Sequence, residues 1–299
     1  MRGMRAKKHV SPNDRLTHAV FGQNKDINPE ELFASEAVPV RTDDKGKLFV
    51  MTKLEFKNDS GVILPQCLND SYIRAVHDSV LSLYLAGCTH FTAEQIDREM
   101  KGYDIYRNEA DSKSKSLQNI NGAINILRRS LIIIDASNEA NARGYKFRET
   151  HFSDNLLHIR GLHSVLMNGR QVDAYEFLAE PVLYSYASQK GQVISCDIDM
   201  LKFPKKLSAT RNNIILQRYL IERIEVMKNS HNNLGCVILY ESIYEALNMQ
   251  DSSRIEKKRI RDTVKKLLDN WQGIYFESYF EEPQKAGVPK RDIVINLFK

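Results

Sequence analysis

The chain has 299 residues and a mass of 34.4 kDa, which is enough for two domains of ordinary size. Hydrophobic residues make up 42% and charged residues 27%, so the composition is that of a globular protein and excludes collagen-like and low-complexity chains. No apolar run is long enough to span a membrane, and no apolar segment follows the basic N-terminus as in a secretory signal. We therefore expect a cytoplasmic protein, with a formal net charge of +5.

The four cysteines are far apart in the sequence and form no CxxC pair; they are Cys67, Cys88, Cys196 and Cys236. Zinc sites usually draw their ligands from closely spaced cysteines and histidines. The spacing therefore predicts reduced thiols, no metal site and no cofactor.

Residues 1–12 carry several basic side chains and no acidic one. Such a segment is typical of a solvated, flexible arm, and an arm of this charge can become ordered on a phosphate backbone. Further along, residues 38–41 and 47–56 have the pattern of two strands with a turn at 43–46, and residues 29–32 could open a short helix. This hairpin leads into the first large unit.

Three helices follow, from residue 70 to Gly87, from 92 to 101 and over 113–129. The second begins with a capping box formed by Thr92 and Gln95. The β-branched run 130–135 predicts a strand, 138–144 a turn and 145–150 a returning strand, which is the order of a winged helix. Residues 151–178 add further strands, with a two-residue hairpin turn at Asn168-Gly169.

The same order recurs in the second half of the chain. Helices are predicted over 211–227, 237–247 and from a capping box at Ser253 and Glu256 to about residue 270. Two strands, 274–280 and 292–298, then flank a loop. We therefore predict an α+β fold of two tandem winged-helix domains. The arm covers residues 1–12, the N-terminal domain 13–205 and the C-terminal domain 206–299.

The last long helix concentrates the positive charge of the chain. Residues 253–271 contain seven basic side chains: Arg254, Lys257, Lys258, Arg259, Arg261, Lys265 and Lys266. At helical spacing, Arg254, Lys258, Arg261 and Lys265 should lie opposite the apolar Ile260, Val264 and Leu267. A solvated surface helix would show the same composition. We favour DNA contact, because this is the third helix of a helix-turn-helix pattern, the one that enters the major groove.

The third helix of the first domain is less basic. Lys113 and Lys115 lie at its start, and Arg128 and Arg129 lie at its end. The amides of residues 117–121 could pair with adenine, or they could cap the helix or face water. We count these four basic residues as candidate DNA contacts, although the composition favours protein contacts over base recognition for the first domain.

The search for catalytic motifs finds neither a phosphate-binding GxxxxGK[ST] loop nor an HExxH zinc motif. Tyr184 and Tyr186 could supply a nucleophile, but no partnered base is visible in the sequence, and packing explains both. Asp197 and Asp199 could hold a metal, although a cap or a turn explains them better. We therefore expect a protein that is not an enzyme.

Several runs of the chain resemble a family of replication-initiator-like proteins found on plasmids, phages and integrative elements of Gram-positive bacteria. These runs are residues 13–17, 183–187, 219–224, 238–244, 259–261 and 268–271. The related tandem winged-helix plasmid initiators read origin repeats with the C-terminal domain, while the N-terminal domain dimerises and makes additional DNA contacts. The resemblance implies that residues 206–299 read DNA with helix 253–270, and that the N-terminal domain forms a homodimer. The extra N-terminal hairpin and the insert at 151–180 depart from that pattern.

Together these features predict a non-enzymatic protein that binds double-stranded DNA at origin repeats, recruits host replication proteins and initiates replication of a mobile element. A transcriptional regulator would need the same domains, and an iterated repeat beside the gene would favour the initiator. A nuclease or strand transferase would need a carboxylate or histidine cluster that the sequence does not show. A winged-helix scaffold that binds only protein would fail to retain DNA at low salt.

Overall fold

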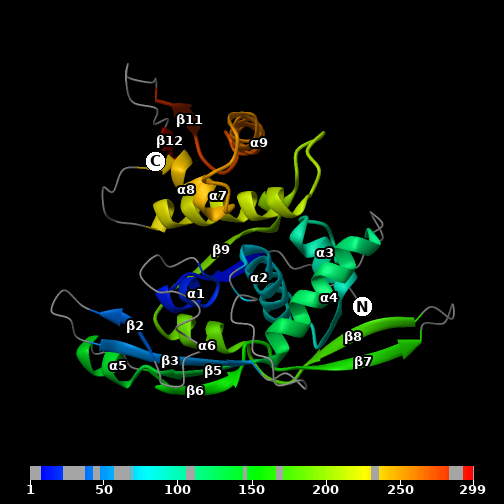
Figure 1. Cartoon of the computed structure of the whole chain (residues 1–299), viewed down its shortest axis with the longest axis vertical. Coiled ribbons are helices and arrows are strands. Elements are labelled where there is room, and N and C mark those ends of the chain that lie inside the picture. The colour runs from blue at the N-terminus through cyan, green and yellow to red at the C-terminus, as the bar shows by residue number, and fades with distance from the viewer. Residues whose placement is uncertain are drawn as a thin grey trace. The chain divides into compact units, whose positions relative to one another are not determined.

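The structure is a computed structural model that describes residues 8–22, 38–42, 48–56, 68, 70–105, 112–143, 147–165, 171–229, 236–282 and 292–298. The chain forms two compact units (Figure 1). Unit 1 comprises residues 1–99 and 104–193, and unit 2 comprises residues 100–103 and 194–299. Both are mixed α+β, as the sequence predicts.

One part of unit 1 combines three helices with a small antiparallel sheet. The helices are α2 (Ser71–Leu85), α3 (Ala93–Met100) and α4 (Ser114–Arg129). The sheet has the strand order β4-β8-β7, built from β4 (His90–Thr92), β7 (Ile159–Val165) and β8 (Gln171–Phe177). The predicted hairpin at Asn168-Gly169 is consistent with the antiparallel β7–β8 pair, although the turn itself lies outside the described residues.

A second sheet in unit 1 has the order β2-β3-β5-β6, with β2 (Val38–Thr42), β3 (Leu48–Phe56), β5 (Ser130–Asp135) and β6 (His151–Asn155). The predicted hairpin of residues 38–41 and 47–56 is confirmed by the antiparallel β2–β3 pair. The turn at 43–46 and the short helix predicted at 29–32 lie outside the described residues. Helices α1 (Arg15–Val20) and α6 (Val182–Gln189) complete the unit.

The β-hairpin predicted after α4 is confirmed in its antiparallel pairing, because β5 pairs with β6, but its turn and the bounds of its second strand are wrong. Strand β5 pairs with both β3 and β6, whereas β4 pairs with β8 of the β7–β8 hairpin. Residues 138–144 do not form a turn, because helix α5 (Ser137–Arg143) occupies this segment. Asp135 starts it by accepting a hydrogen bond from the Ser137 amide (2.9 Å), and Glu139 is fully buried. The returning strand therefore begins only at His151.

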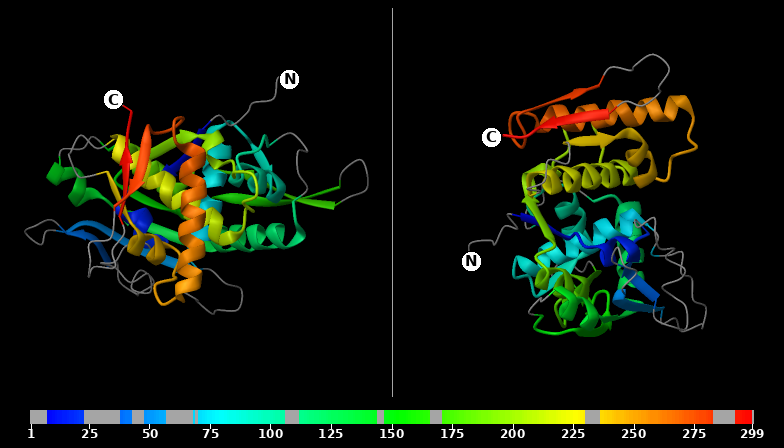
Figure 2. Two further views of the ribbon diagram at one scale, coloured as in Figure 1. Left: turned by 90° about the horizontal axis from the view of Figure 1, so that it is seen from above. Right: turned by 90° about the vertical axis from the view of Figure 1, so that its left-hand side faces the viewer.

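Unit 2 contains a long helix, a three-stranded sheet and two further helices. Its elements are α7 (Arg211–Asn229), β10 (Val237–Leu239), α8 (Tyr240–Ala246), α9 (Arg254–Trp271), β11 (Ser278–Glu281) and β12 (Asp292–Asn296). They follow β9 (Val193–Asp197) and the short 3-10 helix η3 (Ile198–Leu201). Figure 2 shows α9 in orange beside the red strands.

Two predictions for unit 2 need correction. The helix predicted over 237–247 is shorter, because Val237–Leu239 pairs with β12 and only Tyr240–Ala246 is helical. The strand predicted from Ile274 begins at Ser278, because residues 271–276 turn back after α9 and pair Gln272 with Phe276.

The two units share one topology. Unit 1 runs α2–β4–α3–α4–β7–β8 with the sheet order β4-β8-β7, and unit 2 runs α7–β10–α8–α9–β11–β12 with the order β10-β12-β11. In each case the strand after the first helix pairs with the last strand. Within this shared run of six elements, the main difference is the segment 130–155, which unit 1 inserts between its third helix and its hairpin. Unit 1 also has β1 (Lys8–Pro12), α1, β2 and β3 before the run and α6 after it.

Gly102 brings the short segment 100–103 against η3 within unit 2. Its φ is +70°, a backbone conformation that side-chain-bearing residues rarely adopt. A Cβ added to Gly102 would lie 2.7 Å from the backbone nitrogen of Lys202 and 2.8 Å from the carbonyl oxygen of Ile198. Only glycine allows this close approach.

The N-terminal segment is not a free arm throughout, which corrects the prediction for residues 1–12. Residues Lys8–Pro12 form strand β1, and His9 is buried. His9 Nδ1 lies 2.8 Å from the buried Glu99 carboxylate and 3.0 Å from Ser82 Oγ, to which the Val10 amide also donates. These polar partners help to hold β1 in the folded unit, and the hydropathy of the sequence gives no sign of them.

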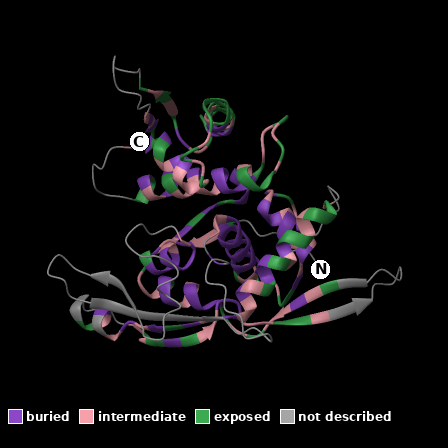
Figure 3. Cartoon of the chain, viewed as in Figure 1, coloured by how far each residue is buried: buried purple, intermediate pink, exposed green. Residues whose placement is uncertain are grey.

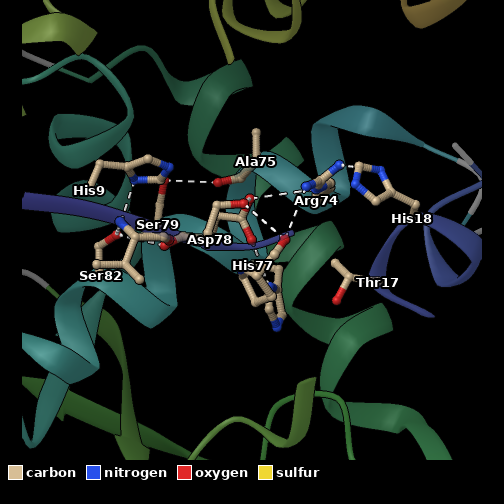
Figure 4. Close-up of polar contacts among 12 residues, drawn as sticks. His9, Thr17, His18, Arg74, Ala75, His77, Asp78, Ser79 and Ser82 are labelled. Atoms are coloured by element: carbon tan, nitrogen blue, oxygen red, sulfur yellow. Dashed lines mark hydrogen bonds and ion pairs between the residues drawn. The ribbon is translucent and has the colours of Figure 1, made fainter. Parts of the chain in front are cut away.

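The contacts of β1 continue into a buried polar network along α2 (Figure 4). Ser11 Oγ donates to Asp78 (2.7 Å), His77 Nδ1 lies 3.0 Å from the same carboxylate, and Arg74 donates to the Pro12 carbonyl (3.1 Å). Burial raises the pKa of Asp78, but the hydrogen bond with His77 and the charge of Arg74 lower it to a net value below its ordinary range. The carboxylate therefore stays ionised and holds β1 on α2.

The substitution His9→Ala should lower the free energy of unfolding by about 1–3 kcal/mol, because it removes a contact of a fully buried carboxylate. Urea denaturation would measure the change. His90→Ala is a matched control, since His90 is exposed and lies 3.6 Å from Glu176. If both variants unfolded like the wild type, β1 would contribute nothing to the fold. Deletion of residues 1–10 should likewise destabilise the chain.

Candidate nucleic-acid interface

Helix α9 starts at a fixed residue because its first turn is capped in both directions. The Glu256 amide donates to Ser253 Oγ (3.3 Å), and the Ser253 amide donates to the Glu256 carboxylate (2.9 Å). The Ser253 hydroxyl also donates to this carboxylate (2.7 Å), and its hydrogen bond, together with that from the Ser253 amide, lowers the pKa of Glu256. The capping box predicted from the sequence is therefore confirmed, and Arg254 is the first helical residue.

One side of α9 is fixed in the core of unit 2. Its buried residues are Ile260, Val264, Leu267, Leu268 and Trp271. Trp271 is the largest fully buried side chain of the described chain, and its indole N–H donates to the Met200 carbonyl (3.1 Å). Gln217 of α7 donates to the same oxygen (3.2 Å). These contacts set the rotation of α9 about its own axis, and with it the direction of the opposite side (Figure 3).

The opposite side, which we call the outer face of α9, consists of Arg254, Ile255, Lys258, Arg259, Asp262, Lys265, Lys266 and Asp269, all of them exposed. Five of the eight are cations, and Asp269 accepts a hydrogen bond from the Tyr279 hydroxyl (2.6 Å). Within the described residues, no carboxylate lies at ion-pair distance from any of these five. Asp262 lies one turn from Lys258 and from Lys266, yet it forms no ion pair with either. The positive charges are therefore available to an anionic partner.

Lys257 and Arg261 do not belong to the outer face, which corrects the predicted position of Arg261 in the stripe. The Arg261 guanidinium donates to the hydroxyl of Tyr244 on α8 (3.3 Å). The Lys257 ammonium lies 5.3 Å from the centroid of the same ring and donates to the Gln250 carbonyl. Both side chains are only partly exposed. Their charges hold α8 against α9, a role that the spacing of basic residues could not distinguish from contact with a ligand.

Ile255 is the residue of this face that the sequence reading missed. It is 67% exposed, whereas Ile260, the next apolar residue of α9, is buried. Its spacing could have predicted this exposure, because a residue five positions before Ile260 does not fall on the apolar stripe of the helix.

The four basic residues predicted for α4 do not form one group. Lys113 and Lys115 are exposed at its start, while Arg128 and Arg129 are half-buried at its end. A Cβ added to Gly161 of β7 would lie 3.1 Å from Arg128, so this guanidinium packs along the hairpin. Among the amides, the structure leaves Gln118, Asn119 and Asn125 exposed, but Asn121 accepts a hydrogen bond from the Tyr175 hydroxyl (3.0 Å).

Tyr186, one of the two tyrosines considered as nucleophiles, does have a basic partner, but the group is buried in unit 1. The Tyr186 hydroxyl donates to Glu139 (2.7 Å), and Lys190 lies 3.2 Å from the same carboxylate. All three side chains are almost fully buried, so a substrate has no access to them. Asp197 caps η3 by accepting from the Asp199 amide (2.9 Å), as predicted. In the described parts of the chain, no three His, Cys, Asp or Glu side chains are grouped as metal ligands would be.

No protein-family model matches the chain, and no curated protein matches it. Among solved structures, the chain is similar to two crystal structures of domains 2 and 3 of RctB, each at 12% sequence identity. One, of selenomethionine derivatives, covers 90% of this chain and 98% of its own with a TM-score of 0.38; the other covers 83% and 87% with a TM-score of 0.41. Within the described residues, no helix combines the length and the apolar composition needed to cross a membrane.

The substitution Trp271→Ala should lower the free energy of unfolding by about 3–5 kcal/mol, because it leaves a large cavity under α9 and removes the hydrogen bond to Met200. Ile255→Ala, on the same helix, should change it by less than about 0.5 kcal/mol. Urea denaturation of both variants measures the difference. Equal losses would mean that the two sides of α9 are not buried and exposed as described.

Proposed function

We propose that unit 2 is a winged helix that binds double-stranded DNA, with the outer face of α9 in the major groove. The observation that carries the proposal is the division of α9 into two sides: one side is packed in the core of unit 2, and the opposite side carries the exposed cations. The topology of unit 2 supports it, because α7–β10–α8–α9–β11–β12 is the order of a winged helix, with α9 as the third helix. In helix-turn-helix proteins this is the helix that enters the groove.

The side chains of the outer face suit both phosphate contact and base recognition. Lysine ammonium groups neutralise phosphates and add affinity without sequence preference. Arginine guanidinium groups can pair bidentately with guanine in the major groove. Arg254 and Arg259 lie in the first two turns of α9, and Lys265 and Lys266 lie a turn or more further on. We therefore assign base recognition to the first half of the helix and phosphate contact to the second.

Unit 1 repeats the topology of unit 2, and we propose that it is a second winged helix. Of the four basic residues at its third helix, α4, only Lys113 at the N-cap and Lys115 in the first turn are exposed, since Arg128 and Arg129 are half-buried. We expect it to contribute less to DNA affinity and to serve protein contacts, including a homodimer.

The biological role that we propose is initiation of replication of a plasmid or another mobile element, through origin repeats and host replication proteins and without an enzymatic step of its own. The resemblance of short sequence runs to replication-initiator-like proteins supports this role. A plasmid that carries the repeats selected by the protein should replicate in a host only when the protein is supplied. Repression of a reporter promoter without replication would instead indicate a transcriptional regulator.

The first test of DNA binding is its salt dependence on a duplex selected from a random pool. If the five cations of the outer face neutralise about five phosphates, log K should fall with log salt at a slope of about −4 to −5. The double variant Lys265→Gln/Lys266→Gln should reduce this slope by about 2. The matched control Lys113→Gln/Lys115→Gln, in exposed positions of α4, should change it less. A slope near zero for the wild type would refute the proposal.

Base recognition is tested by competition against single-base variants of the selected site. Arg254→Ala or Arg259→Ala should remove preference at one or two base pairs, since an arginine–guanine pair contributes roughly 1–3 kcal/mol of discrimination. Lys266→Ala should weaken binding to all sites alike. If Lys115→Ala in α4 changed the preference more than both arginine variants did, the assignment of unit 2 as the reading domain would be wrong.

A further inference from the structure

The outer face of α9 carries one apolar side chain, Ile255, in the first turn of the helix. It is 67% exposed, one of the two most exposed large apolar residues of the described chain. Charged residues surround it on the helix surface: Arg254 precedes it, and Lys258 and Arg259 lie three and four residues further on, at the spacing that brings side chains together. Ile255 is thus an exposed apolar side chain surrounded by positively charged ones.

The fold itself gives no reason for isoleucine at this position. The side chain contributes nothing to the core, which α9 contacts through residues from Ile260 to Trp271. A β-branched residue is also a poorer helix former than the alanine, lysine or glutamate that an exposed first turn would accept. Its contribution is therefore expected in a complex.

We propose that Ile255 recognises the C5-methyl group of thymine in the major groove. This inference rests on the proposed DNA binding and adds a base preference to it. The methyl group of thymine is the apolar feature of the major-groove edges, which otherwise present hydrogen-bond donors and acceptors. An aliphatic side chain in the first turn of a groove helix is placed to cover it, and doing so buries apolar surface of both partners.

The surrounding charge identifies the partner. Five unpaired cations share the face with Ile255, so an apolar protein surface docked here would have to cover them without compensating anions. DNA supplies phosphates for the cations and methyl groups for the isoleucine within one groove. Charge complementarity thus selects DNA as the occupant.

Helix geometry limits where the thymine lies. Arg259 follows Ile255 by four residues, which is about 6 Å along an α-helix. Base pairs of B-DNA are stacked about 3.4 Å apart. A thymine contacted by Ile255 should therefore lie within about two base pairs of a guanine contacted by Arg259.

The test uses the full chain and a duplex selected from a random pool, resynthesised with deoxyuridine in place of deoxythymidine at one position at a time. Deoxyuridine removes only the methyl group. At one position near the selected guanine, the wild type should lose about fourfold in affinity, which is the value of one buried methyl group. Ile255→Ala should bind the thymine duplex correspondingly more weakly and should not respond to the uracil substitution. Ile274→Ala, which truncates an equally exposed isoleucine (66%) outside α9, should behave like the wild type.

The outcomes separate this inference from the proposed function. If no duplex is selected, DNA binding itself fails. If the wild type binds a duplex tightly but no uracil position matters, or if Ile255→Ala stays as sensitive to uracil as the wild type, then Ile255 does not read thymine although the proposed function stands. Equal weakening of Ile255→Ala on the thymine and uracil duplexes would place its contact on the DNA backbone and would also overturn the inference.

Discussion

The packing of one side of α9 is the constraint on which the functional account depends. A cationic helix that could rotate about its axis would present an average of its side chains to a ligand. Here Trp271 ends the helix inside the core, and its N–H reaches a carbonyl of η3 that Gln217 of α7 also contacts. The apolar residues from Ile260 to Leu268 continue this contact along the helix. The buried side thus determines which residues face outward, and so the basic residues of the sequence pattern lie together on one exposed face.

The same helix uses positive charge in two different ways. Lys257 and Arg261 are turned towards Tyr244, where an aromatic ring and its hydroxyl bind them and connect α8 to α9. The remaining five cations face water, where their exposure costs little free energy. Within the described residues, no carboxylate forms an ion pair with them. The first group keeps the geometry of the helix pair, and the second is available to a polyanion. Removing a charge from the first group should therefore affect the fold, and removing one from the second should affect binding.

The sequence predicted what depends on neighbouring residues. Both capping boxes, at Thr92 and at Ser253, were visible because a cap needs residues only three positions apart. The apolar stripes of the long helices follow from periodicity in the same way. The sequence could not show which strand of unit 1 pairs with β4. The choice between β5, which directly follows α4, and β8 depends on contacts between residues far apart in the chain. Strand β10 was hidden, since Val237–Leu239 continues smoothly into the helical pattern of α8. Strand β1 was missed because polar contacts such as His9–Glu99 replace the apolar pattern that reveals a buried strand.

The central claim is that the outer face of α9 meets DNA, and hydrogen–deuterium exchange of the full chain tests it most directly. The exchange of backbone amides would be measured with and without a saturating selected duplex, at low salt. The account predicts slower exchange in α9 and in the segment 250–256 that precedes and caps it, with a smaller change in α4. Unchanged exchange in α9, together with protection elsewhere in the chain, would contradict it.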